Sequence, residues 1–396
     1  MRRRTLRLFG AVLLMLIVQA PFAAAAAAAG PSGVAASGYE LIDFQTGQVL
    51  LAHNPNLRLA PASTTKIMTA LLTVMQGHLG RVVRVSRQAY GVEGSSAYLV
   101  PNQRLTLREL LYGLLLVSGN DAAVELAIAD RGSVPAFVAE MNREARALGA
   151  THTTFLNPDG LYLPGHLTTA HDLALFTRAA LTYPDFRTID SSKSYYFPGV
   201  PKPYTLVNQN ILLWNYPGAI GVKIGYTIQA QQSIVAAATR NGVTLIAVAL
   251  HTNYTHMWQD PQTLLNWGFA QFHTLHLVSA GEDFAKAPRG DGRAVATGGF
   301  SWLLGQGQAL PGVRVNYDWP EAWRAGQPVG EVVVGPQAKP LAVIPLVASA
   351  ASPHKAAAGG MLPWAEGGLA AAAGLGIWQL HRRTRHRRYR LRIRRR

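Results

Sequence analysis

The sequence predicts a mixed α/β (α+β) fold in which helices flank an antiparallel sheet, followed by a small all-β domain. Two groups of β-rich runs, Tyr39 to Ala52 and Gln232 to Leu250, enclose a long stretch with helical periodicity. Tight turns such as Asn241-Gly242 join neighbouring runs, so the strands should be antiparallel. From about Leu277 the chain changes to short strands broken by Gly and Pro. We therefore expect one domain over residues 31–275 and a β-rich domain over residues 276–350.

The first thirty residues have the pattern of a secretory signal peptide. Four arginines precede an apolar run from Leu8 to Val18, and an alanine-rich stretch follows Pro21. The alternative is an uncleaved signal anchor, but the apolar run is short for a membrane span and is followed by small residues. We expect residues 1–30 to be cleaved and the protein to be exported.

The C-terminal segment predicts a membrane anchor. Ala356 to Leu380 is rich in Ala, Gly and Leu, and Glu366 is its only charged residue. Residues 351–380 are interpreted as linker and anchor, and the arginine-rich residues 381–396 as a cytoplasmic tail. The alternatives are an interfacial helix or a tail that binds nucleic acid.

Composition limits the possible functions. The chain of 396 residues has a formal charge of +16, but its terminal segments hold fourteen of the 37 basic residues, so the middle is close to neutral. A nucleic-acid-binding body is therefore not expected. The absence of cysteine excludes disulfides, thiolate metal sites and cysteine nucleophiles, and is compatible with export. His166 and His171 have no further ligands at metal-binding spacing, so neither a metal nor another cofactor is expected.

The first predicted elements lead to a pair of reactive side chains. Strands Tyr39 to Asp43 and Gln48 to Ala52 form a hairpin, after which a helix is expected to begin near Pro61. Ser63 and Lys66 are three residues apart, so their side chains should share one helix face. Burial would depress the pKa of the lysine and allow it to deprotonate the serine. The same spacing also fits an ordinary helix start with a solvated lysine.

Two further helices are predicted around a short polar loop. After a strand from Arg81 to Ser86 and the loop Glu93 to Ser96, a helix should run from Leu105 to Val117, with Thr106 as N-cap and Glu109 at its third position. The next helix is expected over Ala122 to Ala129, which places Ser118 and Asn120 on an interhelical loop.

The middle of the chain continues with helices and turns. Val134 to Leu148 is amphipathic, Phe155 to Leu161 is a turn cluster, and Thr168 or Thr169 should cap a helix that runs to about Leu181.

The segment Gly221 to Thr227 is predicted to be a strand that carries Lys223 and is followed by two antiparallel neighbours. A lysine on a strand usually points to solvent. Gly225, however, allows another backbone to lie close alongside, as an edge strand that grips an extended peptide requires.

Three motifs in one order, Ser63-x-x-Lys66, Ser118-x-Asn120 and Lys223-x-Gly225, are the set found in penicillin-binding proteins and class A β-lactamases. Together with their surroundings, they make the chain resemble the D-alanyl-D-alanine carboxypeptidases, the low-molecular-weight penicillin-binding proteins. The resemblance covers about residues 35 to 350 and implies a β-lactamase/transpeptidase-like domain. The matching stretches, with the motifs included, are Tyr39 to Gly47, Pro61 to Ala70, Glu93 to Ser96, Ser118 to Ala122, Asn157 to Leu161, His166 to Asp172 and Gly221 to Thr227.

The resemblance also implies roles for the motif residues. The catalytic residues would be Ser63, which attacks the peptidoglycan stem peptide, Lys66, which takes its proton, and Ser118, which passes a proton to the leaving amine. The substrate-binding residues would be Asn120, Lys223, Gly225 and Thr227. Lys223 would attract the terminal carboxylate, and its charge would help to keep Lys66 neutral.

The same resemblance implies further properties of the protein. The backbone N–H of Ser63 and one from the strand after Lys223 would form an oxyanion hole. β-Lactams would act as covalent inhibitors. The protein would work at the extracytoplasmic face of the cell membrane, held by its C-terminal segment.

The sequence departs from the family pattern in three places. Ile224 replaces the hydroxyl residue usual between Lys and Gly, Ile228 to Gln231 lacks a glycine, and residues 252–260 lack an arginine. Loss of one hydrogen bond to a charged group would lower the rate about ten- to a hundredfold. A β-lactamase, an endopeptidase or a non-catalytic wall-binding protein on the same fold are the alternatives.

Overall fold

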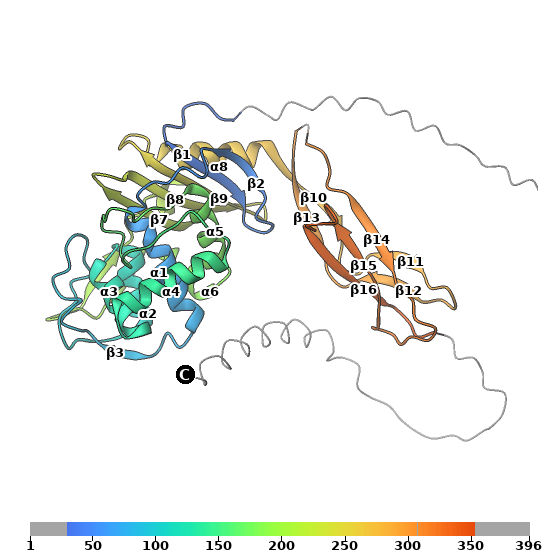
Figure 1. Ribbon diagram of the computed structural model, residues 1–396, viewed down its shortest axis with the longest axis horizontal. Coiled ribbons are helices and arrows are strands. Elements are labelled where there is room, and N and C mark those ends of the chain that lie inside the picture. Colours follow the sequence, from blue (N-terminus) through green and yellow to red (C-terminus); the bar gives the residue numbers. More distant parts are fainter. Residues whose placement is uncertain (1–29, 307, 353–396) are drawn as a thin grey trace, which may run out of the picture.

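The computed structural model describes residues 30–306 and 308–352. Figure 1 shows a larger part, in which helices pack on a sheet, and a slender all-β part beyond it. The predicted fold class is confirmed.

The helices are η1 Ala62–Thr65, α1 Lys66–Gln76, α2 Leu107–Leu116, α3 Asn120–Arg131, α4 Val134–Ala147, α5 Ala170–Leu181, α6 Pro184–Asp190, α7 Leu212–Asn215 and α8 Gln259–Gln271. The strands of the larger part are β1 Gly38–Asp43, β2 Val49–His53, β3 Val82–Arg84, β4 Arg104–Thr106, β5 Ser194–Phe197, β6 Tyr204–Val207, β7 Ala219–Thr227, β8 Gln231–Arg240 and β9 Val243–Thr252. The remaining strands are β10 Phe272–Val278, β11 Asp283–Lys286, β12 Arg293–Ala296, β13 Phe300–Gly305, β14 Val313–Tyr317, β15 Pro328–Val334 and β16 Ala342–Ala348.

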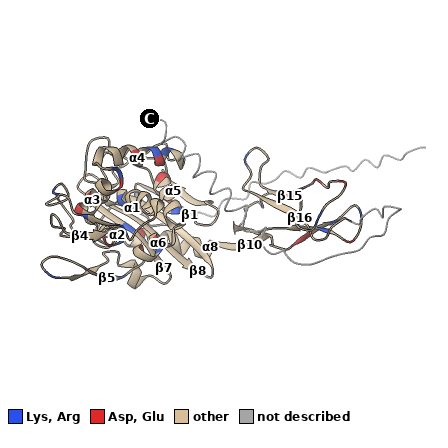
Figure 2. Cartoon of the chain, turned by 90° about the horizontal axis from the view of Figure 1, so that it is seen from below, with Lys and Arg blue, Asp and Glu red and all other residues tan. Residues whose placement is uncertain are grey.

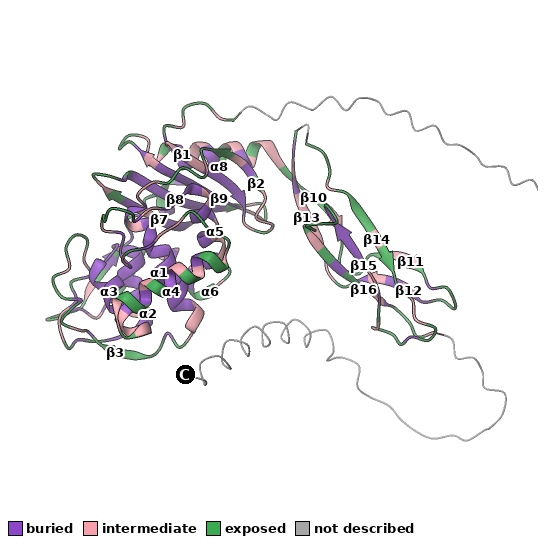
Figure 3. Ribbon diagram, in the orientation of Figure 1, coloured by how far each residue is buried: buried purple, intermediate pink, exposed green. Residues whose placement is uncertain are grey.

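The main sheet has the strand order β2-β1-β9-β8-β7 and is antiparallel throughout. Because side chains alternate along a strand, β9 contributes residues to two apolar cores, one on each face of the sheet. Ile246, Val248 and Leu250 face the helical core, whereas Leu245 and its alternate neighbours pack towards α8. Figure 3 shows that the buried residues concentrate in this sheet and the helices beside it. As predicted, β7 lies at an edge of the sheet and is followed by two antiparallel neighbours.

The predicted helix caps are present in α2 and α5. Thr106 and Glu109 form a complete capping box, and Thr169 accepts a hydrogen bond from the N–H of Asp172. The prediction for Asn120 was wrong: it is the first residue of α3 rather than part of the loop. Its N–H donates to Ser95 O at 2.7 Å, so the backbone of the preceding polar loop supplies a partner that a free helix start would lack.

The all-β part follows α8 without a loop, since α8 ends at Gln271 and β10 begins at Phe272. β10 pairs with β13, and the other strands form a sheet in the order β11-β12-β16-β15-β14. Trp323, Val329 and Val332 are buried in its core. Figure 2 shows charged residues of both signs on the two parts.

Within residues 30–306 and 308–352, no helix has both the length and the apolar character needed to cross a bilayer. The predicted signal peptide, apart from Gly30, and the predicted anchor from Ala356 to Leu380 lie outside the described residues.

Candidate active site

The amine of Lys66 lies at the centre of a buried cluster. Lys66 has no exposed surface, which excludes the solvated lysine. Its Nζ lies 3.0 Å from Ser63 Oγ, 2.6 Å from Asn120 Oδ1 and 2.5 Å from the backbone oxygen of Asp159. Ser63 sits in the single 3₁₀ turn η1, directly before α1, so the predicted contact between the two side chains is present.

Two of these three contacts fix the direction of the amine's hydrogens. The Asp159 carbonyl can only accept, and Asn120 Nδ2 donates to Glu93 O at 2.6 Å, which turns its oxygen towards Lys66. A neutral amine has two N–H donors and one lone pair. When both donors serve Asn120 and Asp159, the lone pair is left for the hydroxyl hydrogen of Ser63.

Burial also favours the neutral form of Lys66. It lowers the pKa of this lysine to about 8, against the opposing effect of the carboxylates of Asp159 and Asp121. Burial lowers the pKa of Lys223 to about 7, with Lys66 adding to the decrease and Asp190 opposing it. Repulsion between the two lysines therefore lowers the pKa of Lys223, whereas burial is what lowers the pKa of Lys66.

The loop that supplies the Asp159 carbonyl is held tightly against η1. Asn157 Oδ1 accepts from Gly160 N at 2.7 Å, and its Nδ2 donates to Leu161 O at 2.8 Å. Gly160 has φ +90°, and a Cβ there would lie 1.9 Å from Ala62 O. The roles of the Asp159 and Glu93 carbonyls were not predicted, because a backbone contact has no residue-type signal, although both residues lie in stretches that resemble the family.

The second motif is fixed by Asp121. Its carboxylate accepts from Ala97 N at 2.9 Å, Leu99 N at 3.0 Å and Ser96 Oγ at 2.6 Å. Ser118 is buried and has φ +60°, a conformation that costs about 1–3 kcal/mol outside glycine and persists where surrounding contacts impose it.

β7 approaches the Ser63 turn closely. A Cβ on Gly225 would lie 2.6 Å from Ser63 N and 3.1 Å from Thr64 N, so the predicted close backbone approach is present and its neighbour is η1. Lys223 is buried rather than pointing to solvent, and its Nζ donates to Ile224 O at 2.8 Å. Thr227 is half-buried and accepts from Ala230 N at 3.0 Å. Lys66 and Asn120 thus join the first two motifs, and Gly225 brings the backbone of the third against the Ser63 turn.

The side chain of Ile224 is partly buried and packs against the edge of the core on the α8 side of the sheet. Its partner across the strands is the fully buried Ile234. Ile224 therefore adds apolar contact where the family usually has a hydroxyl.

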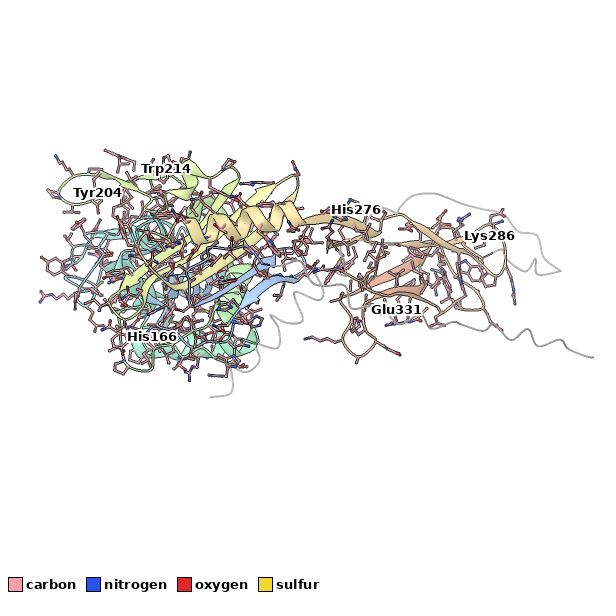
Figure 4. All side chains as sticks on the ribbon, turned by 90° about the horizontal axis from the view of Figure 1, so that it is seen from above. His166, Tyr204, Trp214, His276, Lys286 and Glu331 are labelled. Carbon is pink, nitrogen blue, oxygen red and sulfur yellow. The ribbon has the colours of Figure 1, made fainter. Side chains whose placement is uncertain are left out.

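The two histidines near the site have structural partners. His166 Nε2 lies 3.2 Å from Thr65 Oγ1, and burial lowers its pKa to about 4, so it is neutral. His171 faces Glu40 at 3.0 Å. Figure 4 places His166 in the larger part, far from His276 in the all-β part. In the described residues, no three His, Asp or Glu side chains gather as a metal site would require.

Comparison with known proteins identifies a consistent group. The family model for D-alanyl-D-alanine carboxypeptidase matches residues 24–253. The D-alanyl-D-alanine carboxypeptidase DacF of Bacillus subtilis is 37% identical over 62% of this chain and 65% of its own length, just under two thirds. DacB2 of Mycobacterium tuberculosis is 40% identical over 58% of this chain and 80% of its own length. The structure of penicillin-binding protein 5 from Haemophilus influenzae superposes with a TM-score of 0.67 at 30% identity, covering 82% of this chain and all of that one.

The contact between β7 and η1 predicts the effect of a single methyl group. Gly225→Ala should slow covalent labelling by a fluorescent penicillin about a hundredfold, because the added Cβ must move β7 away from Ser63. Labelling rates measured by gel fluorescence test this. Gly80→Ala is the control, since a Cβ there meets nothing within 4 Å. Equal labelling of the two variants would contradict the prediction.

Proposed function

The chain belongs to the D-alanyl-D-alanine carboxypeptidase family, and on that premise we propose that it removes the terminal D-alanine from peptidoglycan stem peptides. The observation that carries the proposal is the environment of Lys66, whose buried Nζ lies 3.0 Å from Ser63 Oγ and can take its proton once the amine is neutral. A serine becomes a nucleophile when a neighbouring base takes its proton.

Acylation replaces the carbon–nitrogen bond of the substrate with a carbon–oxygen bond to Ser63. Ser63 Oγ bonds to the carbonyl carbon between the two terminal D-alanines as its proton passes to Lys66 Nζ. The carbon–nitrogen bond then breaks, and the leaving amine receives a proton by way of Ser118. Water attacks the acyl-enzyme and releases the shortened peptide.

Three residues of β7 and one of α3 would hold the substrate during these steps. Lys223 attracts the terminal carboxylate, and Thr227, Gly225 and Asn120 border the same space. The N–H of Ser63 and one from the end of β7 would stabilise the oxyanion, an effect worth about 3–4 kcal/mol for each donor. The close approach of Gly225 to Ser63 N supports this arrangement.

β-Lactams would react with the same serine, since they place a strained amide and a carboxylate in the same positions. A β-lactamase would release the hydrolysed drug rapidly, and an endopeptidase would cleave cross-linked rather than monomeric muropeptides. A non-catalytic wall-binding protein has no need for a buried lysine that is placed to take a proton from serine.

We also propose that the protein is exported and held at the extracytoplasmic face of the membrane. The support is sequence pattern: a basic, apolar, alanine-rich start and an apolar C-terminal segment followed by arginines. Along the sequence, the all-β part comes between the active-site motifs and this segment.

Ser63→Ala should abolish both reactions of the nucleophile. Mass spectrometry of residues 31–350 should show a penicilloyl adduct on Ser63 and loss of one alanine from a stem pentapeptide, and the variant should show neither. Persistent labelling of the variant would contradict the assignment. An adduct without alanine release would place the substrate elsewhere in the wall.

Ile224→Thr should raise kcat/KM for the pentapeptide by about tenfold, because a hydroxyl could then bind the substrate carboxylate. Ile224→Val is the matched control: it loses similar apolar packing and gains no hydroxyl. If Val and Thr act alike in steady-state assays, the missing hydroxyl does not limit the enzyme.

Anchoring is tested with a chain that ends at residue 352. The full chain should sediment with membranes, whereas the shortened chain should be exported in soluble form. A carbonate wash at high pH then separates the two anchoring modes, because it removes an interfacial helix and leaves a membrane span in place. Membrane retention of the shortened chain would contradict the proposal.

A further inference from the structure

Tyr98 combines a strained backbone with an exposed aromatic ring. Its φ is +56°, in the left-handed region that a bulky side chain rarely adopts, and its exposed fraction is 74%. Its backbone N–H donates to Ser96 Oγ at 2.8 Å, and in the described part of the chain its phenol group has no hydrogen-bond or ring partner. No contact of the ring within the fold offsets the strain. Residues held in this way often contact a ligand.

Hydrogen bonds on both sides of Tyr98 hold the strained conformation. The N–H groups of Ala97 and Leu99 donate to the carboxylate of Asp121 at 2.9 and 3.0 Å. Ser96 Oγ accepts from the N–H of Tyr98 and donates to the same carboxylate at 2.6 Å. The fold therefore imposes the direction in which the chain presents the ring.

The loop that carries Tyr98 borders the catalytic centre. Ser95 O accepts from the N–H of Asn120 at 2.7 Å, and Glu93 O accepts from the Nδ2 of the same asparagine at 2.6 Å. The Oδ1 of Asn120 accepts in turn from Lys66 Nζ. Tyr98 therefore lies three residues beyond a direct contact with the site, and its ring is exposed rather than packed in the core.

A second loop meets this one beside Asn120 and also exposes apolar side chains. A Cβ on Gly94 would lie 2.8 Å from Asn120 Nδ2 and 3.8 Å from Leu161 Cδ2. Tyr162 and Leu163, which follow in the second loop, are each 43% exposed. Large exposed apolar side chains on two adjoining loops indicate a contact surface for a ligand.

We propose that Tyr98 is a specificity-determining residue whose ring packs on the stem residues that precede the two terminal D-alanines. The inference rests on the proposed function and deepens it. The terminal carboxylate would be held at Lys223, which is only 2% exposed, so an exposed ring lies nearer the end of the peptide that leaves the site. A ring that covers the aliphatic parts of those residues removes apolar surface from water.

The test compares a stem pentapeptide with acetyl-D-Ala-D-Ala, which lacks the residues that the ring would contact. Tyr98→Asn should lower kcat/KM for the pentapeptide about tenfold, chiefly through a higher KM, and leave kcat/KM for the short peptide unchanged. Tyr98→Phe keeps the ring and should behave as wild type with both peptides. If wild type does not cleave the short peptide, acylation by a penicillin nucleus without an acyl side chain takes its place.

Tyr196→Asn is the matched control. Tyr196 is 69% exposed on β5, and its neighbour Tyr195 stacks on Tyr112 of α2, so the ring of Tyr196 points away from that helix. This variant should leave kcat/KM for both peptides unchanged.

Thermal melting separates substrate contact from a structural role. Asparagine tolerates the left-handed conformation better than tyrosine, so Tyr98→Asn should melt no lower than wild type. A lower melting temperature together with equal losses on both peptides would show that the ring supports the fold, and would overturn the inference.

An unchanged kcat/KM for the pentapeptide in Tyr98→Asn, or an equal loss in Tyr196→Asn, would also overturn the inference, and both results leave the proposed function intact. If wild type cleaves neither peptide, the proposed function fails, and the inference fails with it. Penicillin labelling of Ser63 then shows whether the nucleophile itself is active.

Discussion

The structure depends on the burial of one amine. Lys66 Nζ is removed from water and surrounded by Ser63, Asn120 and the Asp159 carbonyl, which come from η1, α3 and the loop before α5. Each partner is in turn held by its own contacts: Asn120 by Glu93 O, and the 157–161 loop by Asn157 and Gly160. The three oxygens accept from the amine while it is charged, and a neutral amine that keeps its bonds to Asn120 and Asp159 turns its lone pair to Ser63. The packing of three distant segments therefore sets the direction from which Lys66 can take a proton.

This arrangement is obtained at a cost to stability. Lys66, Lys223 and Asp190 are fully or almost fully buried, and Ser118 adopts a left-handed backbone conformation. Each would be unfavourable in an ordinary core. They lie where the helical core and the edge of the sheet meet, between two well-packed apolar clusters that stabilise the fold. Active sites commonly combine local strain with such a framework.

Much of the fold followed from local pattern. The hairpin at the start, the capping box at Thr106 and Glu109, and the three strands around Lys223 all have periodicity or cap residues that need no distant partner. The start of α3 was misplaced because the N–H of Asn120 is satisfied by Ser95 O, a contact with a residue that is remote in sequence. The motif spacing predicted that Ser63 and Lys66 meet. It could not predict the carbonyl of Asp159 or the carboxylate of Asp190, whose positions depend on loop geometry and on the end of α6.

The direct passage from α8 into β10 has a mechanical consequence. Because Gln271 and Phe272 are consecutive, no flexible linker separates the helix under the main sheet from the first strand of the all-β part. A hinge would allow the two parts to turn freely about each other. A continuous backbone instead makes α8 and β10 a single connected segment, so the reach of the all-β part from the main sheet depends on how many residues its strands contain.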